Sequence, residues 1–187
     1  MSKKFSGLHT ALITPFQHDK SVDYESLTNL IHEQVEHDVD GIVVLGTTGE
    51  SPVISESESE KIIKLAVKIA KDKVKIIVGT GSNNTKLAQD KSRLAEDLGA
   101  DAVLCMNPYY NKPTQEGMCQ HFTEIADSIG IPIILYNIKG RTSVNLETNI
   151  VVKLSKHQNI VGIKEASGDL VQIMNVINSV SSNFDII

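Results

Sequence analysis

The stretch Ile160-Val161-Gly162-Ile163-Lys164-Glu165 decides the fold of this chain of 187 residues, because it ends an apolar run in a charged pair. A run that is apolar on both faces is typical of a parallel β-strand covered by helices. Similar runs, rich in β-branched residues, recur roughly every 30 residues, which is the size of a strand–helix unit. They occupy residues 10–13, 42–45, 74–78, 102–105, 131–136 and 160–163, and a seventh at 184–187 is cut off where the sequence ends.

Helical patterns fill the intervals between these runs. Ser55-Glu56-Ser57-Glu58 has the spacing of a capping box, and Gly99 stands where a helix through Leu98 needs its terminating glycine. Six helices are predicted, over residues 24–35, 55–70, 84–98, 114–126, 146–154 and 170–180. Strict alternation of strand and helix indicates an α/β protein with a parallel sheet, predicted as a single domain over residues 1–187.

Two architectures fit this alternation: an open doubly wound sheet, and an eight-stranded (β/α)8 barrel of the TIM type. Polar segments follow the second, fourth, fifth and sixth strands, and an open sheet would leave four such loops too far apart to share a site. A closed barrel brings the carboxyl ends of all its strands to one face. The sequence therefore predicts a barrel, and because such barrels take about 250 residues, one that is truncated within its seventh strand.

Composition excludes several classes of function. The formal net charge is −5, and no face concentrates Lys and Arg as a nucleic-acid interface would. No apolar run approaches the roughly 20 residues of a membrane-spanning helix. Cys105 and Cys119 are too few for a disulfide framework, which favours a cytoplasmic protein.

Lys164 is the most informative single residue. At the end of an apolar strand its amine is partly desolvated, which lowers its pKa and frees neutral amine able to form a Schiff base with a carbonyl compound. The alternative is a structural lysine that reaches solvent or pairs with Glu165.

Other polar residues at the strand ends have two interpretations each. Thr47 and Thr48 lie in a Gly-Thr-Thr-Gly turn that suits a carboxylate, or forms an ordinary connection. Tyr110 and Tyr136 could transfer protons through their phenols, or fill the barrel mouth. Arg141 could clamp a carboxylate, or lie on the surface.

Together these segments resemble the dihydrodipicolinate synthase family, which belongs to the pyruvate-dependent class I aldolases with N-acetylneuraminate lyase. The resemblance covers residues 7–187 and depends on motifs that occur in order at successive strand ends. They are Gly46-Thr47-Thr48-Gly49-Glu50-Ser51, Gly79-Thr80-Gly81, Pro108-Tyr109-Tyr110-Asn111-Lys112-Pro113, Tyr136-Asn137, Gly140-Arg141-Thr142 and Gly162-Ile163-Lys164-Glu165-Ala166.

The resemblance implies a role for each candidate residue. Lys164 would form the Schiff base with pyruvate, whose carboxylate Thr47 and Thr48 would hold. Tyr136 would shuttle protons, and Thr47 and Tyr110 would complete the relay, with Tyr110 reaching into a neighbouring subunit. Arg141 would bind the carboxylate of L-aspartate 4-semialdehyde, the second substrate.

It further implies a cytoplasmic homo-oligomer, a dimer or tetramer, that uses no metal or organic cofactor and acts in lysine and diaminopimelate biosynthesis. It also implies that strand eight and a C-terminal helical region are absent. Two alternatives stay open: another pyruvate-dependent aldolase or lyase of the same family, and a truncated barrel fragment without catalytic activity. A nucleotide-binding open sheet comes third, because no phosphate-binding fingerprint occurs.

Overall fold

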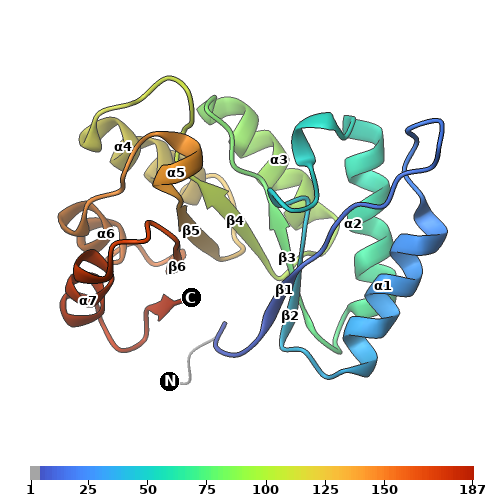
Figure 1. Ribbon diagram of the computed structural model, residues 1–187. Helices are drawn as coiled ribbons and strands as arrows, with labels where there is room; N and C mark the ends of the chain where they lie inside the picture. Colours follow the sequence, from blue (N-terminus) through green and yellow to red (C-terminus); the bar gives the residue numbers. More distant parts are fainter. Residues whose placement is uncertain (1–4) are drawn as a thin grey trace.

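The sheet is the framework of the molecule. In the computed structural model, which describes residues 5–187, seven parallel strands form one sheet in the order β1-β2-β3-β4-β5-β6-β7 (Figure 1). The strands are β1 (His9–Ala11), β2 (Gly41–Val44), β3 (Lys75–Gly79), β4 (Ala102–Met106), β5 (Ile133–Asn137), β6 (Ile160–Glu165) and β7 (Asp185–Ile186). Because the strand order never reverses, the doubly wound alternative is wrong and the barrel type is confirmed.

Helices cover the outside of the curled sheet, except the single turn α5, which lies at the carboxyl end of β5 (Figure 1). They are α1 (Tyr24–Glu36), α2 (Glu56–Ala70), α3 (Thr85–Asp97), α4 (Gln115–Ala126), α5 (Lys139–Thr142), α6 (Thr148–Leu154) and α7 (Leu170–Ser179), with a 3₁₀ helix η1 (Ser51–Val53). The predicted capping box at Ser55 is present, and Asn84 and Thr114 cap α3 and α4 as the sequence indicates. None of the helices in residues 5–187 is long and apolar enough to cross a bilayer.

Three local predictions were wrong. The sequence indicated a loop at residues 140–142 and missed η1, because turns this short carry no hydrophobic period. The first strand occupies His9–Ala11 rather than residues 10–13, and Ile13 is 54% exposed. Its partner β2 ends where Leu45 adopts a φ of 55°, so the pairing cannot extend further.

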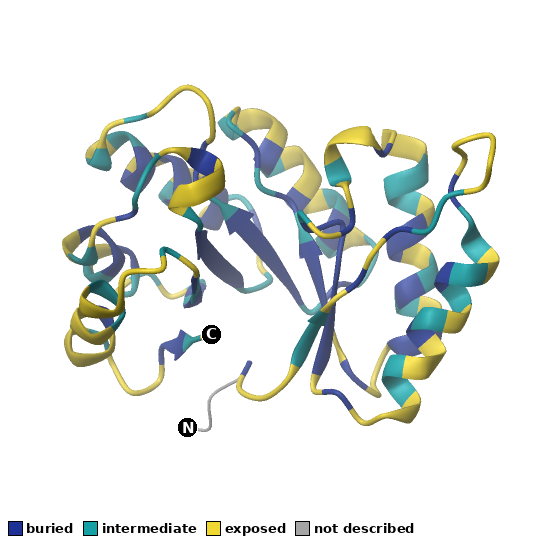
Figure 2. Ribbon diagram, viewed as in Figure 1, coloured by how far each residue is buried: buried dark blue, intermediate teal, exposed yellow. Residues whose placement is uncertain are grey.

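Two apolar cores lie on the two faces of the sheet. In Figure 2 most of the strands are coloured as buried, and the long helices are buried on one side and exposed on the other. The outer core fills the space between strands and helices, and Phe122 and Ile31 are among its fully buried members. The inner core lies inside the curl and consists of Phe5, Val43, Ile77, Ala102, Leu104, Ile134 and Tyr136. Since alternate residues of a strand point to opposite faces, burial of both sets explains the uninterrupted apolar runs in the sequence.

On the open side of the curl, a hydrogen bond joins the segment before β1 to β7. The structure shows no ladder between β1 and β7 within residues 5–187. Instead, the backbone N–H of Phe5 donates to Oδ2 of Asp185 over 3.0 Å, and both residues are buried. Phe5 thereby brings its ring into the inner core from the amino-terminal side of the sheet.

A buried histidine links two of the outer helices and predicts a pH-dependent stability. His121 on α4 contacts Thr85 Oγ1 through Nδ1 at 2.9 Å, and burial lowers the pKa of His121 to about 4. The unfolded chain binds a proton near pH 6.5 that the folded chain does not. The free energy of unfolding should therefore fall as the pH drops from about 7 to 4, by about 3 kcal/mol from this group.

Urea unfolding at a series of pH values measures the effect. We expect His121→Gln to flatten the pH dependence in this window. Parallel curves for wild type and His121→Gln would contradict the assignment.

Candidate active site

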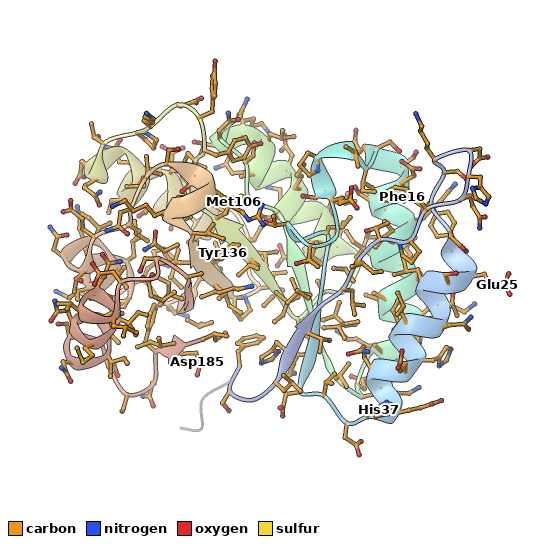
Figure 3. The ribbon with its side chains drawn as sticks, viewed as in Figure 1. Phe16, Glu25, His37, Met106, Tyr136 and Asp185 are labelled. Carbon is orange, nitrogen blue, oxygen red and sulfur yellow. The ribbon has the colours of Figure 1, made fainter. Side chains whose placement is uncertain are left out.

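The site lies at the carboxyl ends of β2, β4, β5 and β6, where the loops of the curled sheet meet. Tyr136 in β5 and Lys164 in β6 are register partners, so their side chains share one face of the sheet. Tyr136 belongs to the inner core, and that face is therefore the inside of the curl. Figure 3 shows Tyr136 and Met106 directed into the space that the sheet encloses.

Lys164 and Tyr136 are in contact. The Lys164 ammonium nitrogen lies 4.7 Å from the centre of the Tyr136 ring, within the range of a cation–π interaction. Tyr136 is buried and Lys164 is half-buried. In residues 5–187 the structure shows no ion pair between Lys164 and Glu165, whose side chain is on the other face of β6. The structural alternative of a Lys164–Glu165 pair is therefore wrong.

Burial sets the protonation of both groups. Desolvation lowers the pKa of Lys164, because the ammonium loses hydration that the neutral amine does not need. Burial also raises the pKa of Tyr136, which the Arg141 guanidinium and a hydrogen bond from Thr47 partly oppose. Tyr136 is thus within the influence of Thr47, Arg141 and Lys164, and the structure brings these four predicted residues together.

A cavity of about 260 Å³ is lined by Thr47 and Arg141 of this group, whereas Lys164 and Tyr136 do not line it. Met106 and Ile138 add apolar side chains to its walls. Its other lining residues are Ser51, Pro52, Gly81, Lys91, Tyr109 and Thr142. A mixed wall of this size fits a small organic anion.

Two short connections position the polar residues of the cavity. The Thr47 turn is held by Thr14, whose hydroxyl donates to the Gly49 carbonyl over 2.7 Å. Arg141 lies on the single turn α5, which is anchored by the buried Thr142 hydroxyl, a donor to the Ile138 and Val144 carbonyls at 3.1 and 3.0 Å.

Two predicted residues lie apart from this group. Tyr110 is 87% exposed and Thr48 is exposed, and neither lines the cavity. Tyr109 lines it instead. The sequence could have identified Met106 as well, because strand alternation places it on the same face as Leu104, whereas nothing in the helical pattern of α3 marks Lys91 as a lining residue.

The lowered pKa of Lys164 predicts an amine that is reactive at lower pH than an exposed lysine. The ammonium is not nucleophilic, so a lower pKa leaves more neutral amine at any given pH. Competitive acetylation with acetic anhydride, followed by peptide mapping, measures the pH midpoint for each lysine. We expect the midpoint of Lys164 to lie below the usual lysine value of about 10.4. A midpoint at or above that value would contradict the assigned desolvation.

Comparison with known proteins identifies a group of similar chains. The model of the dihydrodipicolinate synthetase family matches residues 4–187. The 4-hydroxy-tetrahydrodipicolinate synthase of Endomicrobium trichonymphae is 52% identical over 184 residues, which are 98% of this chain and 62% of that protein. The chain thus spans about three fifths of the length of such relatives.

Solved structures agree with this comparison. A crystal structure of dihydrodipicolinate synthase from Aquifex aeolicus superposes with a TM-score of 0.95 at 43% identity, covering 98% of this chain and 62% of that one. The chloride-inhibited dihydrodipicolinate synthase from Acinetobacter baumannii, complexed with pyruvate, gives a TM-score of 0.94 at 42% identity, covering 96% of this chain and 62% of that one.

Proposed function

This chain belongs to the dihydrodipicolinate synthetase family, and on that premise we propose that it forms a Schiff base with pyruvate and condenses it with L-aspartate 4-semialdehyde. The product is 4-hydroxy-tetrahydrodipicolinate, an intermediate of lysine and diaminopimelate biosynthesis. The observation that carries the proposal is the desolvated Lys164 amine against the Tyr136 ring, 4.7 Å from its centre. A relative of similar fold is described as complexed with pyruvate, which supports the choice of first substrate.

The first half of the reaction joins Lys164 to pyruvate. The neutral Lys164 nitrogen attacks C2 of pyruvate and passes one of its protons to the former carbonyl oxygen. That oxygen takes up a second proton and leaves as water. The resulting iminium withdraws electrons from the methyl carbon, which then loses a proton to give an enamine. Tyr136 is the proposed proton carrier, because its phenol lies beside both Lys164 and Thr47.

The second half forms the carbon–carbon bond and releases the enzyme. The enamine carbon attacks the aldehyde carbon of the semialdehyde, and the new oxyanion is protonated. The amino group of the semialdehyde portion then attacks C2 and displaces the Lys164 nitrogen, which closes the ring of the product. The iminium nitrogen accepts an electron pair when the methyl carbon loses its proton, and returns it when the carbon–carbon bond forms, so the proposed chemistry requires no metal or organic cofactor.

The remaining residues would bind the two carboxylates and complete the relay. Thr47 and Thr48 are proposed to hold the pyruvate carboxylate, and Arg141 the carboxylate of the semialdehyde, because guanidinium and carboxylate form paired hydrogen bonds. Tyr110 would act in the site of a neighbouring subunit. Its exposure of 87% supports a role outside its own cavity, and with it a homo-oligomer, a dimer or tetramer. A cytoplasmic location stays a prediction.

Trapping of the imine tests the proposal. The chain is incubated with pyruvate and borohydride, which reduces an imine to a stable amine, and the adduct is located by intact mass and peptide mapping. We expect one adduct, confined to the peptide that contains Lys164. Folded protein that carries no adduct, or adducts spread over exposed lysines, would contradict the proposal. Turnover with different aldehydes then separates the synthase from a sugar-acid lyase.

A further inference from the structure

A row of buried polar side chains lies on the outer face of the sheet, directly behind the candidate site. Asn107, Asn137 and Glu165 have exposed fractions of 0%, 0% and 9%. Each immediately follows a residue of the inner face, namely Met106, Tyr136 and Lys164. The inner residues are register partners across β4, β5 and β6, and Asn137 and Glu165 are partners one position further. We name Asn107, Asn137 and Glu165 the outer ladder.

Hydrogen bonds run along the outer ladder from strand to strand. The side-chain amide of Asn107 donates to Oδ1 of Asn137 over 2.9 Å. The amide of Asn137 in turn donates to both carboxylate oxygens of Glu165, over 3.1 and 3.0 Å. The chain of donors therefore ends on a carboxylate, which can only accept.

Neighbouring groups hold the outer ladder from the helix side. The Leu146 N–H donates to Asn137 Oδ1 over 3.0 Å. The Ser167 N–H donates to one Glu165 oxygen over 2.9 Å, and the Gln172 amide of α7 donates to the other over 3.1 Å. Within residues 5–187 no cation forms a salt bridge with Glu165.

A buried carboxylate without a counterion is costly, even when it is fully hydrogen-bonded. Apolar residues would stabilise this contact between strands and helices without that cost. What the outer ladder provides is a defined strand register, because its donors and acceptors match in only one register of β5 against β6.

The pairing of β5 with β6 contains an irregularity that makes its register less well defined. The pairing of β5 with β6 shifts between Ile133 and Ile134, where one additional residue of β6 is accommodated. Such an irregularity leaves the register beyond it less firmly defined, and a slip by one residue would turn every following side chain to the other face. The Tyr136–Lys164 pair lies just beyond this point.

We propose that Asn137 and Glu165 are positioning residues, which through the outer ladder fix Lys164 against Tyr136 on the inner face. The catalytic consequence rests on the proposed function. Reactions at a held amine depend on geometry within about 1 Å, and misplacement of that size costs about a hundredfold in rate. Thr47 and Thr48, which are proposed to hold the pyruvate carboxylate, lie in the turn after β2 and are not part of the outer ladder.

The test compares two single variants with the double variant that combines them. Glu165→Gln places two amides against each other. Asn137→Asp places two carboxylates against each other. The double variant restores one amide against one carboxylate, with the roles exchanged, and position 137 still accepts from Asn107 and Leu146. The side-chain amides of Asn145 and Gln172, which contact the two exchanged groups, can rotate by half a turn to match them. For each protein, borohydride trapping over a range of pyruvate concentrations gives a limiting rate and a half-saturating concentration.

We expect each single variant to lower the limiting trapping rate of folded protein about tenfold to a hundredfold, with the half-saturating concentration changed no more than about twofold. The double variant should recover most of the rate. Trapping by both single variants at the wild-type rate would overturn the proposal, and so would a double variant no better than the single ones. Gln172→Leu, a milder variant on α7, should act in the same direction and serves if a single variant does not fold.

A matched control separates positioning from stability. Asn159 precedes β6 at its other end, and its amide donates to the Ala126 and Ile129 carbonyls over 3.2 and 2.9 Å. Asn159→Ala should lower the melting temperature and leave the limiting trapping rate of folded protein unchanged. If the outer ladder had a purely structural role, Glu165→Gln would also lower the melting temperature and leave the limiting trapping rate unchanged. That result would overturn the proposal.

The acetylation rate of Lys164 tests the positioning role of the outer ladder without pyruvate. If the wild type traps no pyruvate, the proposed function fails, and acetylation of Lys164 then tests the outer ladder alone. A loosened strand end exposes the amine, so its limiting acetylation rate at high pH should rise severalfold in the single variants and return in the double variant. An unchanged rate in both single variants would overturn the proposal.

Discussion

On the proposed function, we expect Lys164→Ala to abolish the pyruvate adduct and to lower turnover by at least about 10⁴-fold, which is the order of loss seen when a covalent nucleophile is removed. The reason is that, among residues 5–187, no other amine takes part in the desolvated contact with the Tyr136 ring. Lys164→Arg gives the same result, because a guanidinium keeps the positive charge but forms no imine. Borohydride trapping with peptide mapping, and a turnover assay with both substrates, measure the two effects.

The control for this prediction is Lys156→Ala, which removes an exposed lysine from the turn that precedes β6. It should keep both the adduct and the turnover of the wild type. A pyruvate adduct that persists in Lys164→Ala, on protein shown to be folded by circular dichroism, would assign the Schiff base to another residue.

Tyr136→Phe produces the second large effect, a loss of about 10² to 10⁴ in the rate of imine formation, as expected for removal of a positioned proton carrier. The substitution keeps the ring in the inner core and over Lys164, and it removes only the hydroxyl. The half-saturating pyruvate concentration should therefore change little. Borohydride trapping quenched at short times measures the rate of imine formation, and thermal unfolding shows whether the inner core is intact.

The same substitution elsewhere provides the comparison. In the part of the chain that the structure describes, the buried hydroxyl of Tyr24 on α1 has no hydrogen-bond partner. Tyr24→Phe should leave imine formation unchanged and not lower the free energy of unfolding. Equal rates for Tyr136→Phe and the wild type would remove Tyr136 from the relay.

Much of the fold was predictable because it depends on local patterns. The apolar runs around Ile42, Ile76 and Ile134 gave the strands, and end signals such as Ser55 and Gly99 gave helix limits. The choice of a barrel over an open sheet came from polar residues at four strand ends, and the observed strand order confirms it.

The site was predictable only in part, since its geometry depends on contacts between distant segments. The sequence placed Lys164 and Glu165 next to each other and allowed an ion pair, but strand geometry sends them to opposite faces. It also gave no sign that Asn137 would bridge Asn107 to Glu165. The position of Tyr110 after β4 predicts a side chain near the site. The backbone of Tyr110 has a φ of 70°, and its side chain is exposed to solvent.

The strand order also governs how the molecule assembles during its synthesis. Each strand pairs with the one made just before it, so every new pairing closes a loop of only tens of residues, which costs little chain entropy. A growing chain can add strands to a sheet that already exists, from the amino-terminal end onward. The Phe5–Asp185 hydrogen bond spans 180 positions and is the exception. Its two partners are far apart in the sequence, so this contact closes only after the six strands and the helices between them have been made.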